Sequence, residues 1–568
     1  MMPHNAEPFI AARDLLLRLH TDYDAAVREF RWPMMNRFNW ALDFFDHLPA
    51  DDLALWCIGE TEEKLSFGAL RVRSNQIASY LRGLGIRRGD RVMLLVPNIR
   101  QLWETLLALM KLGAVISPAT ILLTEADVKD RFERGQMRHA IVDASLVGRF
   151  KNLPGSYTRI AVGGAPGWHR FEDAYAAAET FVPDGETRAT DALVMYFTSG
   201  TTAKPKLVLH SHQSYPVGLL SAMYCFAPQP GDIQLGIASP GWAAHMYGLF
   251  AGWNAGTAIV AMAQPRFDAK KVLDVLARCG VTVFWGPPTV WRMLIQEELG
   301  PRPAGLRGVL SGGEPLNPEV IEHVQRAWGL TLRDVYGQTE TTLLVGNSSG
   351  QAIVPGSMGR PMPGFVVKLL DENGAEVEEG EGEIAVALDP PPLGLLQGYQ
   401  QDDASVRPIE GRYYRTGDLA TRGLDGRLTF VGRADDVFKS SDYRVSPFEI
   451  ESALIEHEAV AEAAVVPSPD PQRLVVPKAF ILLAVGHPPD RTTALDIFSR
   501  MRGRLAPYKR VRRIEFSELP KTISGKIRRA ELRQQEAARR REGVRGAAEF
   551  WEQDFPELLG RSPARSGA

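Results

Sequence analysis

A segment of small hydroxyl residues, glycine and lysine follows a buried-strand pattern that runs from Leu193 to Phe197. The segment extends from Tyr196 to Lys206 and reads Tyr-Phe-Thr-Ser-Gly-Thr-Thr-Ala-Lys-Pro-Lys. A loop of this composition can turn several backbone N–H groups inward, and its two lysines add positive charge that suits a polyphosphate. The second glycine followed by Lys and Ser or Thr, which a Walker A loop requires, is missing, so a P-loop ATPase is excluded. The segment predicts a phosphate-binding loop, although by itself it would also fit an ordinary exposed turn.

Five further segments combine glycine with carboxylate, hydroxyl or basic side chains, and they follow the loop in order along the chain. They are Ser311-Gly-Gly-Glu-Pro315, Asp334-Val-Tyr-Gly-Gln-Thr-Glu340, Tyr414-Arg-Thr-Gly-Asp-Leu419, Gly432-Arg-Ala-Asp-Asp436 and Pro520-Lys-Thr-Ile-Ser-Gly-Lys526. In order and spacing, the six segments resemble the adenylate-forming family, which includes acyl-CoA synthetases, peptide-synthetase adenylation domains and luciferases. The resemblance covers nearly the whole chain. It implies an enzyme that uses ATP to activate a carboxylic acid as its acyl-adenylate and then passes the acyl group to coenzyme A.

The resemblance also implies which residues bind ATP. The loop would grip the β- and γ-phosphates and later pyrophosphate, and its small residues would let it move. Tyr336 would stack on adenine, with a core aromatic as the alternative reading, and Asp418 can accept hydrogen bonds from both ribose hydroxyls. The expected ATP-binding residues are Thr198, Ser199, Gly200, Thr201, Thr202, Ala203, Lys204, Pro205, Lys206, Gly312, Gly313, Glu314, Asp334, Val335, Tyr336, Gly337, Gln338, Asp418 and Arg433.

Three residues are expected to act in the chemistry: Lys526, Thr339 and Glu340. When a carboxylate attacks the α-phosphorus, negative charge gathers on two anions, and Lys526 matches the family lysine that bridges them. At about 4 Å and an effective dielectric near 20, one such contact is worth roughly 4 kcal/mol before desolvation. Glu340 is assigned to Mg²⁺, which commonly takes one or two carboxylates together with phosphate oxygens and water. Surface ion pairing is the alternative for single residues, but it does not explain six motifs in register.

The thioester step is expected to use a second placement of the C-terminal domain, with Asp435 as the hinge. The expected coenzyme A-binding residues are Ser441, Asp442, Tyr443, Arg444 and Arg473. Relatives usually have Gly where this chain has Asp442, and a side chain there could crowd the pantetheine tunnel. Ala203 likewise replaces a common Gly, but its methyl group is small.

The acid itself is expected to be medium-chain, branched or aromatic. The segment from Phe38 to Asp46 and the Tyr-Gly-Gln-Thr-Glu form most resemble synthetases for such acids, whereas acetate-specific relatives have Trp at the position of Gly337. The small residue should therefore lie at the floor of the acyl tunnel and leave the tunnel open beyond two or three carbons. Trp242 and His245 fall where relatives carry aromatic residues that wall the acyl site.

The segments that position these motifs alternate strand and helix patterns from about residue 65 to 334, which implies βαβ units. A β-rich stretch follows from about Gly356, with turns such as Asp425-Gly426. A compact α+β domain then closes the chain, and its Arg-rich tail beyond Arg529 reads as a solvated helix or loose tail. The predicted fold is α/β: a large N-terminal AMP-binding region over 1–434 with a β-rich subdomain, and a small mobile α+β lid over 435–568.

Composition limits the partners. The 568 residues carry 65 Lys and Arg against 68 Asp and Glu, so the formal net charge of -3 favours neither nucleic acid nor an acidic membrane surface. The three cysteines are few and far apart, which argues against a zinc site or a disulfide framework. Neither a secretory signal pattern nor a membrane span is apparent, so a cytoplasmic location is expected, and an oligomer stays open.

The sequence leaves two other functions open. One is a carrier-loading adenylation protein, which would transfer the acyl group to a protein phosphopantetheine, although no carrier-domain serine motif follows Lys526. The other is a binding protein that has lost catalysis, against which the intact Lys526, Glu340 and Asp418 argue.

Overall fold

The computed structural model describes residues 4–198, 205–264, 266–440, 443–471, 473–522 and 526–559. By compactness the chain divides into two units. Unit 1 consists of Met1–Lys368, Ala385–Tyr414 and Gly423–Thr429, and unit 2 of Leu369–Ile384, Arg415–Arg422 and Phe430–Ala568. Two segments of the β-rich stretch thus cluster with the C-terminal part of the chain. The predicted boundary between residues 434 and 435 stays a prediction.

Unit 1 contains two large sheets of nine strands each. In sheet order, the strands of the first are β16 (Arg360–Pro361), β15 (Thr342–Gly346), β14 (Arg333–Gln338), β13 (Gly308–Gly312), β12 (Val283–Gly286), β10 (Ile233–Gly236), β11 (Ala258–Met262), β1 (Leu53–Ile58) and β2 (Glu62–Ser66). Those of the second are β21 (Val406–Arg407), β20 (Gly398–Gln400), β9 (Lys206–Ser211), β8 (Ala192–Thr198), β4 (Val115–Pro118), β3 (Arg91–Leu95), β5 (His139–Asp143), β6 (Thr158–Val162) and β7 (His169–Arg170). The central pairs are parallel, so the predicted βαβ units are confirmed.

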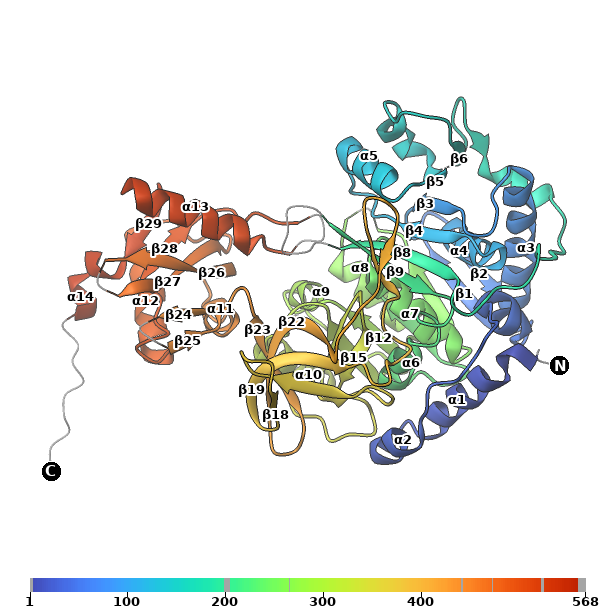
Figure 1. The fold of residues 1–568 in the computed structure, drawn as a ribbon. Helices are drawn as coiled ribbons and strands as arrows, with labels where there is room; N and C mark the ends of the chain where they lie inside the picture. The colour runs from blue at the N-terminus through green and yellow to red at the C-terminus, as the bar shows by residue number, and fades with distance from the viewer. Residues whose placement is uncertain are drawn as a thin grey trace. The chain divides into compact units, whose positions relative to one another are not determined.

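Along the chain, two helices of unit 1 precede β1 and the others connect successive strands (Figure 1). They are α1 (Glu7–Arg18), α2 (Tyr23–Glu29), α3 (Phe67–Gly83), α4 (Arg100–Leu112), α5 (Glu125–Arg134), α6 (Leu220–Phe226), α7 (Ala243–Asn254), α8 (Ala269–Arg278), α9 (Pro288–Leu294) and α10 (Pro318–Trp328). Helix α10 follows Asn317 and has Pro318 in its first turn, where the missing N–H of proline breaks no helical hydrogen bond.

The two faces of the first sheet have different neighbours because successive residues of a strand point to opposite sides. Leu235, Phe284 and Val309 belong to a buried core with residues of α8, α9 and α10. The opposite face, which carries Gln234 and Trp285, packs against α6 and α7. We call this second face the α7 face. Gln234 there donates to the Gly248 carbonyl of α7 at 3.0 Å.

Two smaller sheets and a ribbon complete the fold, and the C-terminal part of the chain is α+β, as predicted. A five-stranded sheet has the order β18 (Glu376–Val377), β17 (Val367–Leu370), β19 (Gly380–Ala387), β22 (Tyr413–Arg422) and β23 (Leu428–Arg433). The C-terminal part has a ribbon of β24 (Phe438–Ser440) and β25 (Tyr443–Val445), and a sheet of β26 (Val460–Asp470), β27 (Leu474–Leu483), β28 (Arg513–Phe516) and β29 (Glu549–Trp551). Its helices are α11 (Pro447–Ile455), α12 (Arg491–Arg504), α13 (Arg529–Glu542) and α14 (Pro556–Leu559).

The described part of the Arg-rich tail is better ordered than a solvated helix or loose tail. Helix α13 lies along the four-stranded sheet in Figure 1, and its Leu532 packs with Phe480 and Val466. Glu536 of α13 is fully buried and lies 2.6 Å from the Nζ of Lys478, which is also buried. A buried ion pair of this kind requires α13 in one register, which the local sequence pattern did not reveal.

The three cysteines, Cys57, Cys225 and Cys279, are buried and free. Within the described residues, none of the helices has the length and apolar character that a membrane crossing needs.

Candidate active site

The centre of the site in unit 1 is the turn between β14 and β15, which carries Gln338, Thr339 and Glu340. The Nε2 of His210 lies 2.7 Å from the Thr339 carbonyl, and its Nδ1 lies 3.0 Å from Ser214 Oγ. Since a carbonyl only accepts, Nε2 must carry the proton and Nδ1 must accept from the hydroxyl. Burial lowers the pKa of His210 to about 4, so the ring is neutral at pH 7.

Two tyrosines hold the same turn from other elements. Tyr247 of α7 donates to the Gln338 carbonyl at 2.6 Å, and Tyr414 donates to Gln338 Oε1 at 3.0 Å. Burial raises the pKa of both phenols well above the usual value, so both remain protonated donors at pH 7. The turn is thus fixed through backbone and side chain. Sequence reasoning gave His210, Tyr247 and Tyr414 no role at this turn, because each lies far from it along the chain, although Tyr414 begins another of the six segments.

Glu340 and Lys206 both contact Tyr399. Tyr399 donates to Glu340 Oε1 at 3.3 Å, and the Nζ of Lys206 lies 5.1 Å from the centre of the Tyr399 ring. The backbone of Glu340 is also fixed, since its carbonyl accepts from Leu396 N–H at 2.8 Å. Strands β8 and β9 pair Thr198 with Lys206 at the two ends of the phosphate loop. The predicted residues between them, Ser199 to Lys204, lie outside the described residues.

The two nucleotide motifs of the first sheet lie side by side at its carboxyl edge. Gly312 of β13 is in register with Val335 of β14, and a Cβ at Gly312 would lie 2.6 Å from the Val335 carbonyl oxygen. Gly313 has a φ of +89°, which favours glycine. Glu314 accepts from Thr289 Oγ1 at 2.7 Å, and burial raises the pKa of Asp334 to about 8. Ligands of open α/β sheets bind at this edge.

The predicted acyl-site residues Trp242 and His245 begin helix α7. His245 is buried, its ring lies 4.9 Å from the ring of Trp103, and burial lowers its pKa to about 4. Trp242 is half-buried at the helix N-cap position. A neutral imidazole and an indole at this point suit an apolar wall.

The expectation for Gly337 needs a correction. A Cβ at this position would lie 2.1 Å from the carbonyl oxygen of Thr342 and 3.1 Å from the Cα of Leu343. The pairing of β14 with β15 shifts register between Tyr336 and Gly337, and this irregularity turns the missing side chain toward the backbone of β15. A larger residue at 337 would therefore have to move a strand, and it would not simply fill a tunnel.

In unit 2, the predicted residues Asp418, Arg433 and Asp435 form one chain of contacts. Arg433 donates from Nη1 to Asp418 Oδ1 at 3.2 Å, and its Nε lies 3.5 Å from Asp435 Oδ1. Asp418 is buried, whereas Asp435 is exposed in a turn between β23 and β24. The guanidinium thus holds the carboxylate that is expected to meet the ribose.

Lys526 also belongs to unit 2, and it is exposed. Its backbone is fixed by Thr522, which donates its N–H to the Lys526 carbonyl at 2.7 Å and accepts the Lys526 N–H on Oγ1 at 3.1 Å. The backbone at Thr522 and Lys526 is therefore closed, while Lys526 as a whole stays exposed.

The predicted coenzyme A residues come together only in part, at a basic pocket. Arg473 lines a pocket of about 530 Å³ together with Arg502, Pro507, Tyr508, Arg510, Arg512 and Glu552. Tyr443 stacks on Tyr508 with ring centres 4.3 Å apart, whereas Arg444 lies 3.2 Å from Glu372 and 3.4 Å from Glu381. Sequence reasoning missed the other pocket arginines, although the run from Tyr508 to Arg513 is visibly basic. Ser441 and Asp442 lie outside the described residues.

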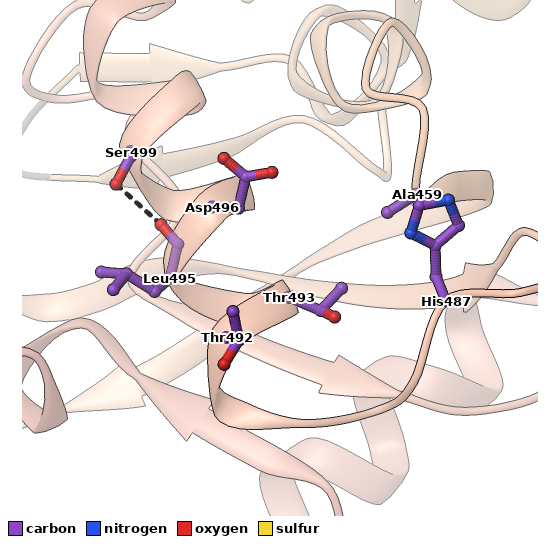
Figure 2. A pocket seen from close by; sticks show the side chains of 7 residues that line it. All are labelled: Ala459, His487, Thr492, Thr493, Leu495, Asp496 and Ser499. Atoms are coloured by element: carbon purple, nitrogen blue, oxygen red, sulfur yellow. Dashed lines mark hydrogen bonds between the residues drawn. The ribbon is translucent and has the colours of Figure 1, made fainter.

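Figure 2 shows another pocket of unit 2, with a volume of about 420 Å³. Thr492, Thr493, Asp496 and Ser499 of α12 line it, and Ser499 Oγ donates to the Leu495 carbonyl at 2.8 Å. The sequence predicted no function for its lining residues.

Comparison with known proteins identifies the family. The model described as AMP-binding enzyme matches residues 45–399, and the AMP-binding enzyme C-terminal domain matches residues 449–526. The chain belongs to the AMP-binding enzyme family. Within it, this chain is an AMP-forming acid–CoA ligase that uses ATP and coenzyme A, as the relatives below indicate. The predicted family, fold class and general reaction are thereby confirmed.

Among the relatives, 4-hydroxybutyrate–CoA ligase 1 of Metallosphaera sedula is 40% identical over 532 residues, covering 91% of this chain and 94% of the relative. The mitochondrial acyl-coenzyme A synthetase ACSM3 of Mus musculus is 36% identical over 91% of this chain and 93% of its own length. The crystal structure of the anthranilate CoA ligase AuaEII in complex with anthranoyl-AMP has a TM-score of 0.80 and 28% identity, covering 89% of this chain and 99% of that one.

Proposed function

We propose that the substrate is a medium-chain, branched or aromatic carboxylic acid, and that the predicted site residues act in the roles given above, except for Gly337 as the floor of the acyl tunnel. The observation that carries the proposal is the fixed turn of Gln338, Thr339 and Glu340 beside Lys206, since it gathers hydroxyl, carboxylate and ammonium groups where a triphosphate needs them. Relatives that are named for 4-hydroxybutyrate and for anthranilate support an acid larger than acetate.

In adenylate formation, the carboxylate of the acid attacks the α-phosphorus and pyrophosphate leaves. Thr339 donates its hydroxyl to the α-phosphate, while Asp418 accepts from the ribose hydroxyls. Lys526 supplies the positive charge for the two approaching anions. A preorganised cation of this kind changes the rate by about a hundredfold to a thousandfold.

Glu340 is the proposed ligand of Mg²⁺. The site fits this ion, because a carboxylate hydrogen-bonded by Tyr399 lies near the phosphate-loop lysine, and hard oxygen ligands with phosphate are what Mg²⁺ prefers. When bound, the ion neutralises charge on the phosphates. The side chains of this chain then only have to orient the nucleotide and exclude competing water.

For the thioester step we propose a second placement of the C-terminal domain about Asp435. The N–H groups of Asp436 and Val437 both donate to the Arg433 carbonyl at 3.1 Å, so a rotation at Asp435 would have to open this turn. The pocket lined by Arg473 offers several guanidinium groups to the phosphates of coenzyme A. Asp442 stands where relatives have Gly, and we propose that it narrows the passage for pantetheine.

One assay tests the proposal: pyrophosphate release from a panel of C2 to C12 and aromatic acids, with and without coenzyme A. We expect pyrophosphate in both cases, acyl-CoA only with coenzyme A, and poor use of acetate. Acetate as the best substrate would refute the proposed acid class. Transfer only to a phosphopantetheinylated carrier protein would favour the carrier-loading alternative.

The expected cytoplasmic location stays a proposal. The acyl-coenzyme A synthetase ACSM3 noted above is described as mitochondrial, so fractionation of the native host is the deciding measurement. Gel filtration would determine the oligomeric state.

A further inference from the structure

Two buried polar groups on the α7 face lack a hydrogen-bond partner among the described residues. They are the indole N–H of Trp285 and the side-chain oxygen of Gln234. Gln234 is fully buried and Trp285 is 8% exposed. An unpaired buried group is destabilising, so native proteins normally supply a partner from protein, water or ligand.

Trp285 is placed by two glycines. A Cβ at Gly236 of the neighbouring strand would lie 2.2 Å from its indole ring, and one at Gly248 of α7 would lie 2.4 Å from it. Phe226 packs on the same indole with ring centres 5.8 Å apart. The ring thus occupies space that only glycines leave open. Any side chain at either glycine would displace it, so its position is defined by packing.

The orientation of the Gln234 amide is also defined. Its nitrogen donates to the Gly248 carbonyl at 3.0 Å, and a reversed amide would place two oxygens against each other. The oxygen Oε1 is therefore the free acceptor. Gln234 and Trp285 lie on the same face of adjacent strands, because Gly236, two residues after Gln234, is in register with Trp285.

The location ties this pair to the acyl side of the site. Trp285 is near the carboxyl end of β12, the edge where α/β sheets bind ligands. Gly248, which contacts both residues, is one helical turn beyond His245 on α7. The pair thus lies one turn deeper along α7 than the predicted acyl-site histidine.

We propose that Trp285 and Gln234 bind a hydroxyl group on the chain of the acid, which makes this ligase selective for hydroxy acids. A hydroxyl both accepts and donates, so it pairs with the indole N–H and with the amide oxygen together. A methyl group in the same place leaves both unpaired. The proposal rests on the proposed function and narrows its substrate class.

The test compares each ω-hydroxy acid with the alkyl acid in which a methyl replaces the hydroxyl, from 3-hydroxypropionate against butyrate to 6-hydroxyhexanoate against heptanoate. The measured quantity is kcat/KM for pyrophosphate release. At one chain length, we expect the hydroxy acid to be preferred by about tenfold or more. A plain apolar tunnel would instead prefer the alkyl acid at every length, and that result would overturn the proposal.

Variants then assign the preference to the indole N–H. Trp285→Phe keeps an aromatic ring without the donor, so the hydroxy-to-alkyl ratio should fall about tenfold while the alkyl acid is still used. Trp328→Phe is the matched control, since the Trp328 indole N–H is likewise buried without a partner in the described residues and belongs to the core on the opposite face. An unchanged ratio in Trp285→Phe would mean that the indole binds an ordered water only, and it would refute the proposal.

Failure of the proposed function is distinguishable from failure of this inference. If the folded wild type releases pyrophosphate with no acid in the panel, the proposed class of acid is wrong. If alkyl acids react well and no hydroxy acid exceeds its alkyl partner, only the hydroxyl site fails.

Discussion

The turn of Gln338 and Thr339 in unit 1 and the loop of Lys526 in unit 2 carry two halves of the same proposed chemistry, yet they are held in opposite ways. The turn receives hydrogen bonds from three side chains of three other segments. Lys526 is exposed, and its described hydrogen bonds are backbone contacts with Thr522. We infer that the nucleotide groups are preorganised, whereas the lysine is delivered to them.

The same contrast extends to the charges. His210, His212 and His245 of unit 1 are buried, and burial lowers the pKa of each. In unit 2, by contrast, the basic pocket is lined by several charged arginines. A neutral, packed frame suits a site that must keep one geometry, and an open basic pocket suits a group that binds and leaves.

The largest expected effect comes from removing the delivered group. Lys526→Ala should slow pyrophosphate release by about a hundredfold to a thousandfold, because the cation for the two anions is lost. Chemically prepared acyl-AMP should still be converted to acyl-CoA at a near-normal rate. Equal loss in both half-reactions would show that Lys526 is not specific to adenylate formation, and the contrast would fail.

The next effect disturbs the fixed half. Gly337→Ala should lower the free energy of unfolding by about 3 kcal/mol, because the new Cβ would meet the Thr342 carbonyl at 2.1 Å. Chemical denaturation measures this loss, and Gly83→Ala is the control, since a Cβ at Gly83 would meet nothing within 4 Å. A Gly337→Ala protein as stable as wild type would restore the view that position 337 faces an open tunnel.

The third effect concerns the pH dependence of stability, which reports on the buried neutral histidine His212. Burial lowers the pKa of His212 to about 3, below the value of about 6.5 in an unfolded chain. The contribution of the neutral imidazole to the free energy of unfolding is therefore complete above pH 6.5, and it is lost as the pH falls toward 3. At pH 5 this loss is about 2 kcal/mol.

His212→Phe should remove that dependence. The stability difference between variant and wild type, measured by denaturation, should move in favour of the variant by about 2 kcal/mol from pH 7.5 to pH 5. A difference that stays constant with pH would mean that folding leaves the pKa of His212 unchanged, and it would contradict the neutral buried ring.

The smallest effect comes from one hydrogen bond of the fixed turn, the bond between Tyr247 and Gln338. Tyr247→Phe leaves the Gln338 carbonyl without its donor at 2.6 Å, and pyrophosphate release should slow by about tenfold. Conversion of supplied acyl-AMP should change less. Tyr80→Phe, which removes a tyrosine bond to the Arg170 carbonyl elsewhere in unit 1, should leave both steps unchanged.

Much of the fold was readable because its signals are local. The strand at Arg91–Leu95, the helix at Arg100–Leu112 and the start of α10 follow from hydrophobic periodicity and from a proline in the first turn. The six motifs likewise indicated the family, because their order along the chain is itself a sequence property. Hydrophobic periodicity does not show which sheet a helix packs against, so the contact of α13 with the sheet through Glu536 and Lys478 could not be predicted.

The sequence by itself determined the chemistry that the chain carries: the phosphate loop, the carboxylates and the lysine that the family uses. Only the tertiary structure decided what holds them, since His210, Tyr247 and Tyr414 are 129, 91 and 76 residues from the groups they bind. It also decided that Gly337 faces a strand, and that Trp285 and Gln234 share a face. Such contacts depend on how distant strands and helices pack, and a one-dimensional pattern contains no term for that packing.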